Sequence, residues 1–169
     1  MVVLPPARFS RATRLAALAL LGLGLPLHAL AAWVAAWTAA PQKLSDLPMP
    51  PGLSADELKV SGTLRQRIVP TLDGPRVRVR FSNLFGRRPL QIEAATVAAS
   101  TGDDGIVTAG LQTLRFGGRT GVTVAPGREV WSDPAALRAQ AGQPLAVSFE
   151  LARETPITTV HRLPLNRSE

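Results

Sequence analysis

The sequence contains few side chains of the types that hydrolytic chemistry requires. A serine nucleophile needs a base within hydrogen-bond reach and a third group that orients the base. The chain has two histidines, and His28 falls within an N-terminal export segment, so His161 is the only candidate base beyond that segment. Ser132 and Asp133 could complete a triad, but neighbours on a strand point to opposite faces. We therefore interpret Asp133-Pro134 as a turn and expect no catalytic site in this chain.

The composition also restricts metal and thiol chemistry. The sequence has no cysteine, which excludes disulfides, thiolate metal sites and a cysteine nucleophile. The one histidine and the scattered carboxylates beyond the export segment do not have the spacing that is typical of a zinc site. We therefore predict no metal site and no cofactor.

Arginines are the most concentrated chemical feature of the chain. In RVRVRF, which ends at Phe81, charged and apolar residues alternate, and a period of two puts them on opposite faces of a strand. Arginines two residues apart on one such face lie about 7 Å from each other. A second group belongs to the preceding strand, so one basic patch forms if the two faces coincide. The candidate residues for this ligand or partner surface are Arg65, Arg67, Arg76, Arg78 and Arg80.

Two interpretations of this basic patch are open. As a binding surface it would attract an anionic polysaccharide, lipid headgroups or nucleic acid. Nucleic acid is disfavoured, because an exported chain with no tyrosine has few rings on which bases can stack. As an outer face it would be solvated and paired with acids such as Glu93 and Glu150, and its charge would discourage edge-to-edge pairing. The sequence alone favours this second interpretation.

The tryptophans and one glycine pair could also have either a binding role or a structural role. Trp33, Trp37 and Trp131 could form a platform on which sugar rings stack. Trp33 and Trp37 are four residues apart and share strand parity, however, so we favour packing in the core. Gly117-Gly118 is interpreted as a tight turn or a bulge rather than a phosphate loop, because no helix follows it as a phosphate site would require.

The N-terminus has the pattern of an export signal. Arg8, Arg11 and Arg14 precede an apolar run from Leu15 to Leu27, and Ala29-Leu30-Ala31 offers a small-x-small cleavage site. Cleavage there would make Ala32 the mature N-terminus and would lower the formal net charge from +7 to +4. The alternative is an uncleaved membrane anchor, since apolar residues continue to about residue 36. The cleaved form predicts a periplasmic or extracellular protein.

Beyond this segment the chain is predicted to be all-β. The clearest strands lie between Thr63 and Leu90, joined by a turn at Asp73-Gly74, where glycine tolerates a positive φ. Glycine or proline separates most of the other apolar stretches, which favours a β-sandwich of jelly-roll type over an α/β fold. Single helical turns are expected at residues 54–57, which have capping-box spacing, and at 135–140. Strands are predicted at residues 33–38, 63–69, 76–81, 90–100, 111–116, 121–125, 129–132, 145–151 and 156–161.

Several blocks of this sequence resemble the N-terminal β-domain of secreted bacterial hydrolases of the GDSL, or SGNH, esterase and lipase family. Their order and spacing are similar to those of the family, and together they cover nearly all of the chain beyond the signal. The blocks are WVAAWTAAPQ (33–42), TLRQRIV (63–69), RVRVRFSNLFGRRPL (76–90), LRFGG (114–118), VTVAPGREVWSDP (122–134), PLAVSFEL (144–151) and TTVH (158–161).

The resemblance implies an organisation of four parts and a partner domain. Residues 1–31 would be the signal peptide, 32–62 a first strand with a Pro-rich loop, 63–161 the sandwich core, and 162–169 a tail truncated before a catalytic domain. In the family that catalytic α/β domain carries a Gly-Asp-Ser block and an Asp-x-x-His block. Neither block occurs in this sequence, so no catalytic residue is carried over.

The resemblance therefore predicts a non-catalytic module of a secreted ester hydrolase that acts on carbohydrate or acyl esters. Its expected partner is a catalytic SGNH domain, and a carbohydrate could also bind. The alternatives are a stand-alone module that binds an envelope glycan or a protein, and a small esterase whose residues are not recognised. A membrane association is expected only if the signal segment stays uncleaved.

Overall fold

The computed structural model of the chain describes residues 33–102 and 105–161. The predicted signal peptide at 1–31 and the predicted tail at 162–169 lie outside the described residues, so both stay predictions. The fold described here is that of the compact unit that begins at Ala35. No helix among the described residues is long and apolar enough to cross a membrane.

Within the described residues the elements are three long strands, six short ones and two turns of 3-10 helix, which confirms the predicted all-β class. In chain order they are β1 (Gln42–Lys43), η1 (Leu44–Asp46), η2 (Ala55–Glu57), β2 (Lys59–Ile68), β3 (Arg80–Ser82), β4 (Leu90–Ala99), β5 (Gln112–Thr113), β6 (Val122–Val124), β7 (Glu129–Trp131), β8 (Leu145–Pro156) and β9 (Thr159–Val160).

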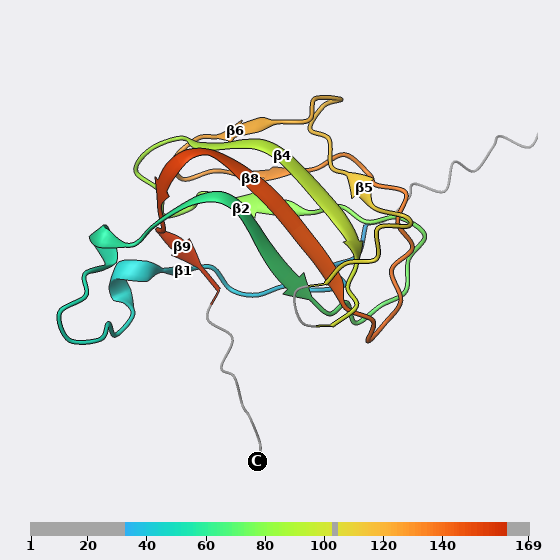
Figure 1. Cartoon of the computed structure of the whole chain (residues 1–169), viewed down its shortest axis with the longest axis horizontal. Coiled ribbons are helices and arrows are strands. Elements are labelled where there is room, and N and C mark those ends of the chain that lie inside the picture. Colours follow the sequence, from blue (N-terminus) through green and yellow to red (C-terminus); the bar gives the residue numbers. More distant parts are fainter. Residues whose placement is uncertain (1–32, 103–104, 162–169) are drawn as a thin grey trace, which may run out of the picture. The chain divides into compact units, whose positions relative to one another are not determined.

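The strands pair in a nested order. β2 pairs antiparallel with β8, β3 with β7, and β4 with β6. β8 also pairs with β4, so the large sheet has the order β2-β8-β4, and β5 and β6 both pair with β4. Figure 1 shows β8 between β2 and β4. This antiparallel pairing, spread over the large sheet and the small β3–β7 and β1–β9 pairs, agrees with the predicted β-sandwich class, whereas the jelly-roll topology stays a prediction.

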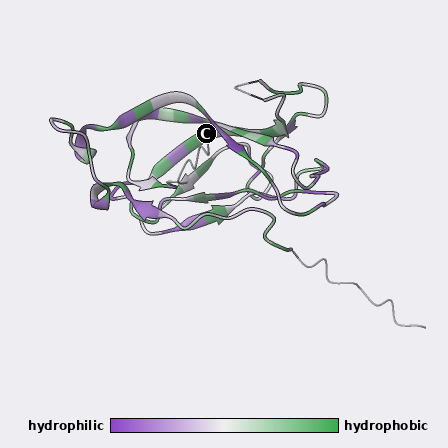
Figure 2. Cartoon of the chain, turned by 90° about the horizontal axis from the view of Figure 1, so that it is seen from below, coloured by the Kyte–Doolittle hydropathy of each residue, from purple (hydrophilic) through white to green (hydrophobic). Residues whose placement is uncertain are grey.

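The core lies between the large sheet and the β3–β7 pair. Along β2, Leu64 and Ile68 pack against the core while their neighbours are exposed. Hydrophobic and hydrophilic residues also follow one another along the ribbons of the sandwich in Figure 2. Phe81 of β3 is 7% exposed. Its ring meets those of Phe149 in β8 and Phe116 edge-on, with centroids 5.5 and 5.7 Å apart. These rings join the two sheets.

The predicted alternation in RVRVRF is confirmed in part, and of the strand predicted at 76–81 only Arg80 and Phe81 belong to β3. Phe81 is buried, and Val77 and Val79 are half-buried and pack against the core cluster. Arg76 and Arg80 are exposed, but Arg78 is half-buried like the two valines. The strand therefore has the register that the sequence predicts, with its apolar residues inward. Its partner, however, is β7 rather than the preceding β2, which pairs with β8.

The pairing of β3 continues toward the N-terminus through isolated bridges. Gly74 bridges Ala139, and Val77 bridges Ala135. The helical turn predicted at 135–140 is therefore wrong, because this stretch is extended and its backbone groups bond to the facing segment. The turn predicted at Asp73-Gly74 also differs, since Gly74 is paired and Asp73 Oδ1 accepts a hydrogen bond from Ala141 N at 2.7 Å.

Asn83 organises the corner that follows β3. Its buried side-chain NH2 group donates to Arg88 O and Val124 O, both at 2.9 Å. Its backbone carbonyl accepts hydrogen bonds from Gly86 N and Gly127 N. A Cβ added to Gly86 would lie 1.7 Å from Asn83 Oδ1, so the corner has room only for glycine there. The SNLFG stretch thus ties β3, β4 and β6 together.

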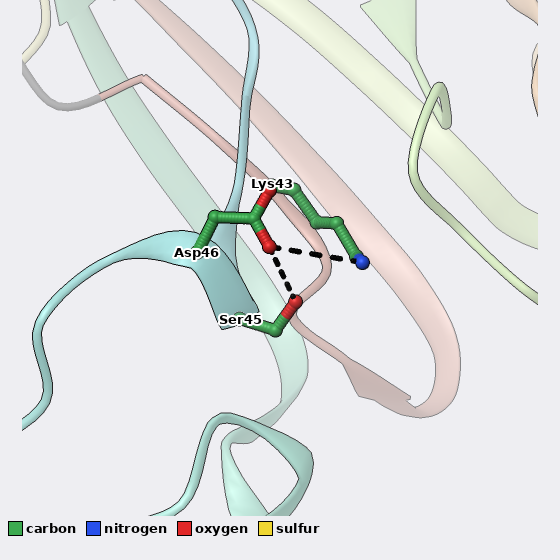
Figure 3. A network of polar contacts seen from close by, with 3 residues as sticks. All are labelled: Lys43, Ser45 and Asp46. Atoms are coloured by element: carbon green, nitrogen blue, oxygen red, sulfur yellow. Dashed lines mark hydrogen bonds and ion pairs between the residues drawn. The ribbon is translucent and has the colours of Figure 1, made fainter.

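The N-terminal part of the unit departs from the prediction at one place and agrees at another. Residues 33–38 form no strand, and the first strand is the two-residue β1, which pairs with β9. The predicted capping box is present, because Ser54 Oγ accepts from Asp56 N and Glu57 Oε2 accepts from Ser54 N. Beside η1, an exposed network joins Lys43, Ser45 and Asp46 (Figure 3).

Candidate functional site

Ser132, the candidate nucleophile, is fully buried. Its side chain is 0% exposed and its Oγ accepts a hydrogen bond from Val79 N at 3.0 Å and donates one to Asp133 O at 3.0 Å. Its backbone N–H donates to Val79 O at 2.8 Å. A hydroxyl that is buried and saturated in this way satisfies the backbone polar groups where β7 ends. It is a structural group.

The carboxylate of Asp133 is likewise engaged in hydrogen bonds, here with the backbone of a turn. Its Oδ1 accepts from Gly117 N at 3.0 Å and its Oδ2 from Gly118 N at 2.7 Å. Both glycines have positive φ, 60° and 82°, as a two-residue hairpin turn of type I′ requires, which confirms the predicted tight turn. The two backbone N–H groups, Gly118 first, hold the pKa of Asp133 below its ordinary value, and the Arg78 and Arg115 charges lower it further.

His161 has partners of its own. Its ring meets the Trp37 ring edge-on with centroids 6.0 Å apart, and its Nδ1 lies 3.5 Å from Ala40 O. His161 therefore has partners separate from those of Ser132 and Asp133, and no hydrogen bond within the described residues joins the histidine to either of them. The arrangement has no serine–base contact of the kind that activates a nucleophile.

The five candidate arginines are divided between two sheets. Arg65 and Arg67 belong to β2 in the large sheet, whereas Arg80 belongs to β3 and Arg78 precedes it in the small one. Arg76 is exposed on the same segment as Arg78. The expected single patch of five is therefore wrong, because β2 and β3 do not pair. Arg65 Nε donates to Ser148 Oγ of β8 at 2.9 Å.

Arg78 and Arg80 meet a residue that was predicted to lie in the core. Their guanidinium carbons lie 5.7 and 5.3 Å from the centre of the Trp131 ring, which is 51% exposed. Arg78 Nε also donates to Ser132 O at 2.8 Å, and Arg80 pairs with Glu129 at 3.2 Å. We call Arg78, Arg80 and Trp131 the Arg–Trp surface. The pairing of Arg80 with Trp131 across β3 and β7 creates it.

The other tryptophans also depart from core packing. Trp33 is 46% exposed, and Trp37 is half-buried against His161. The core prediction is therefore wrong for Trp33 and Trp131. Sequence reasoning missed the contact between Arg80 and Trp131 because it depends on the register between two strands that are about 50 residues apart. The only sequence signal for this contact was the alternation that places the arginines on the outer face of their strand.

The recesses of the described surface include two that border candidate residues or irregular strand pairing. One, of about 190 Å³, is lined by Trp37, Gln66, Arg67, Ile68 and His161. The other, of about 590 Å³, lies beside the irregularity between Ile92 and Ala94 in the β4–β8 pairing. The described residues contain no cluster of histidine and acidic side chains that could hold a metal ion.

No protein-family model matches this chain, and no curated protein matches it.

Proposed function

We propose that this chain is the non-catalytic N-terminal β-sandwich module of a secreted SGNH-type hydrolase that acts on carbohydrate or acyl esters. The observation that carries the non-catalytic part is the state of Ser132. Its hydroxyl is 0% exposed and bonds to backbone groups on both sides, so substrate cannot reach it. His161, the candidate base, contacts Trp37 and Ala40 instead.

The family part of the proposal is supported by where the resembling blocks fall in the fold. TLRQRIV falls in β2, VTVAPGREVWSDP spans β6 and β7, and PLAVSFEL falls in β8. The longest block, RVRVRFSNLFGRRPL, supplies β3 and the Asn83 corner. The blocks thus provide the pairing strands and the Asn83 corner of one sandwich, which is what a shared domain fold requires.

The Arg–Trp surface is our candidate for the contact with a catalytic domain. Trp131 exposes half of its surface beside two guanidinium groups, and tryptophan and arginine are the residues most enriched in interface hot spots. The same surface also favours the second candidate function, a stand-alone module that binds an envelope glycan or a protein partner. An aromatic ring beside cations suits both partners.

The first test is the coding sequence on the 3′ side of the Glu169 codon. We expect an open frame that encodes a Gly-Asp-Ser block and, further on, an Asp-x-x-His block. A frame that closes at once, with no gene for such a domain beside it, would contradict the module assignment and favour the stand-alone one.

The second test measures binding between this chain and the catalytic domain encoded there, produced separately. Trp131→Ala should weaken binding about tenfold or more, because a central interface tryptophan is a typical hot spot. Leu53→Ala is the matched control, since Leu53 is also a large exposed apolar residue, at 40% exposure. Equal affinities of both variants and the wild type would exclude the Arg–Trp surface as the interface.

A further inference from the structure

The recess of about 190 Å³ lies beside the edge of the large sheet, where three distant parts of the chain meet. β2 is the end strand of that sheet and supplies Gln66, Arg67 and Ile68. The stretch that carries Trp37 is fixed near the end of β2, because Thr71 donates to Ala36 O through both its backbone N–H and its hydroxyl. His161 follows β9. We call this recess the edge pocket.

Two aromatic rings form one corner of the edge pocket. The Trp37 and His161 rings are nearly perpendicular, at 84°, and Trp37 is half-buried, so its ring is held by its surroundings. Flat apolar surfaces of this kind pack against the C–H groups of a ligand ring. The volume is below the roughly 300–1,000 Å³ of pockets for drug-sized ligands. The pocket therefore suits one ring of a longer chain whose remainder stays in solvent.

Arg67 gives the edge pocket a positive charge. In the part of the chain that the structure describes, no carboxylate lies within 4.0 Å of its guanidinium, as is true of most of the described arginines. A guanidinium presents a planar fork of N–H donors that matches a carboxylate with two parallel hydrogen bonds. The charge that would complement this pocket is therefore a carboxylate on the ligand.

Gln66 and His161 supply the remaining polar atoms. The amide of Gln66 both donates and accepts, and a ring nitrogen of His161 does one or the other according to its tautomer. Hydroxyl groups require such a mixture of donors and acceptors. The side chain of an acidic peptide would match Arg67, but it has neither hydroxyls for Gln66 nor a rigid ring for Trp37.

We propose that the edge pocket binds a carboxylate-bearing sugar, a uronic acid residue within an anionic polysaccharide. Arg67 would hold the carboxylate, Trp37 would pack against the sugar ring, and Gln66 and His161 would bind its hydroxyls. This site would bind the sugar whether or not a catalytic domain is attached, so it extends beyond the function proposed above.

The test is calorimetric titration of the purified full chain with trigalacturonate. We expect weak binding, with a Kd on the order of 1 mM, as suits a single small pocket. The trimethyl ester of the same trisaccharide keeps the rings and removes the charges, and it should bind about tenfold more weakly or worse. Triglutamate keeps the charges without the rings and should bind equally poorly.

Variants locate the site. Arg67→Gln should weaken trigalacturonate binding about tenfold or more, and Gln66→Ala should weaken it by a smaller factor without removing a buried group. Arg138→Gln removes one exposed arginine elsewhere and is the matched control for net charge. The proposal is overturned if trigalacturonate does not bind at about 10 mM, if the ester or triglutamate binds as well, or if Arg138→Gln matches Arg67→Gln.

Discussion

Ser132 Oγ accepts a hydrogen bond from the backbone N–H of Val79, at 3.0 Å, between the two segments that form the small sheet. Because Ser132 is fully buried, Ser132→Ala would leave that N–H without a partner or water. We expect the substitution to lower the free energy of unfolding by about 1–3 kcal/mol. Urea denaturation measures this, with the exposed Ser61→Ala as the control, expected to change it by under about 0.5 kcal/mol. A neutral Ser132→Ala would mean that the hydroxyl has no structural role.

Arg78→Ala should destabilise the sandwich more than Arg76→Ala. Arg78 is half-buried, donates to Ser132 O at 2.8 Å and stacks on Trp131, whereas Arg76 is exposed on the same segment. A hydrogen bond to a charged donor and a cation–π contact together suggest about 1–3 kcal/mol for Arg78, against under about 0.5 kcal/mol for Arg76. Urea midpoints of the two variants decide it, and equal losses would show that the contacts of Arg78 contribute nothing.

The bond between Asp133 and the Gly117-Gly118 turn should make stability depend on pH. The turn holds the pKa of Asp133 below its ordinary value in the folded protein, so the carboxylate stabilises the fold at neutral pH. This contribution should begin to fall below about pH 4, the range of an ordinary aspartate, and disappear as the pH drops through the lowered folded pKa. Asp133→Asn should have a lower free energy of unfolding than the wild type at pH 7, and this difference should become smaller in acid. If the difference in unfolding free energy stays the same from pH 7 to about pH 2, the protonation of Asp133 is not coupled to folding.

Phe81→Ala should remove the link between the sheets. Phe81 is buried and its ring meets both Phe116 and Phe149, so truncation leaves a large cavity. The expected loss is about 3–5 kcal/mol of unfolding free energy. Phe81→Leu keeps most of the volume and should cost clearly less. If the two variants have the same urea midpoint, the aromatic contacts do not join the sheets as described.

Local sequence patterns predicted the elements that depend on neighbouring residues alone. The faces of RVRVRF, the strand from Leu90, the capping box at Ser54 and the Gly117-Gly118 turn follow from residue type and spacing, because each is fixed by its own backbone and close neighbours. The prediction of a helical turn at residues 135–140 was wrong. Their Ala-rich composition suits a helix, but bridges to Gly74 and Val77 hold them extended.

The candidate surface was harder to predict, because it depends on partners distant in the sequence. Arg65 pairs in register with Ser148, and Arg80 with Trp131, so the arginines of neighbouring strands separate onto different sheets. Nothing in the spacing of these arginines indicates which strand each will meet. The edge pocket was missed for the same reason, since it needs Trp37, Arg67 and His161 to converge from three segments.

The non-catalytic role is tested most directly by assaying the purified chain for hydrolysis of short acyl esters, with His161→Ala measured in parallel. Because Ser132 is buried and His161 contacts Trp37 and Ala40, we predict no turnover above buffer for either protein. Turnover by the wild-type chain that is clearly above buffer and is lost in His161→Ala would contradict this role and would identify the chain as a small esterase.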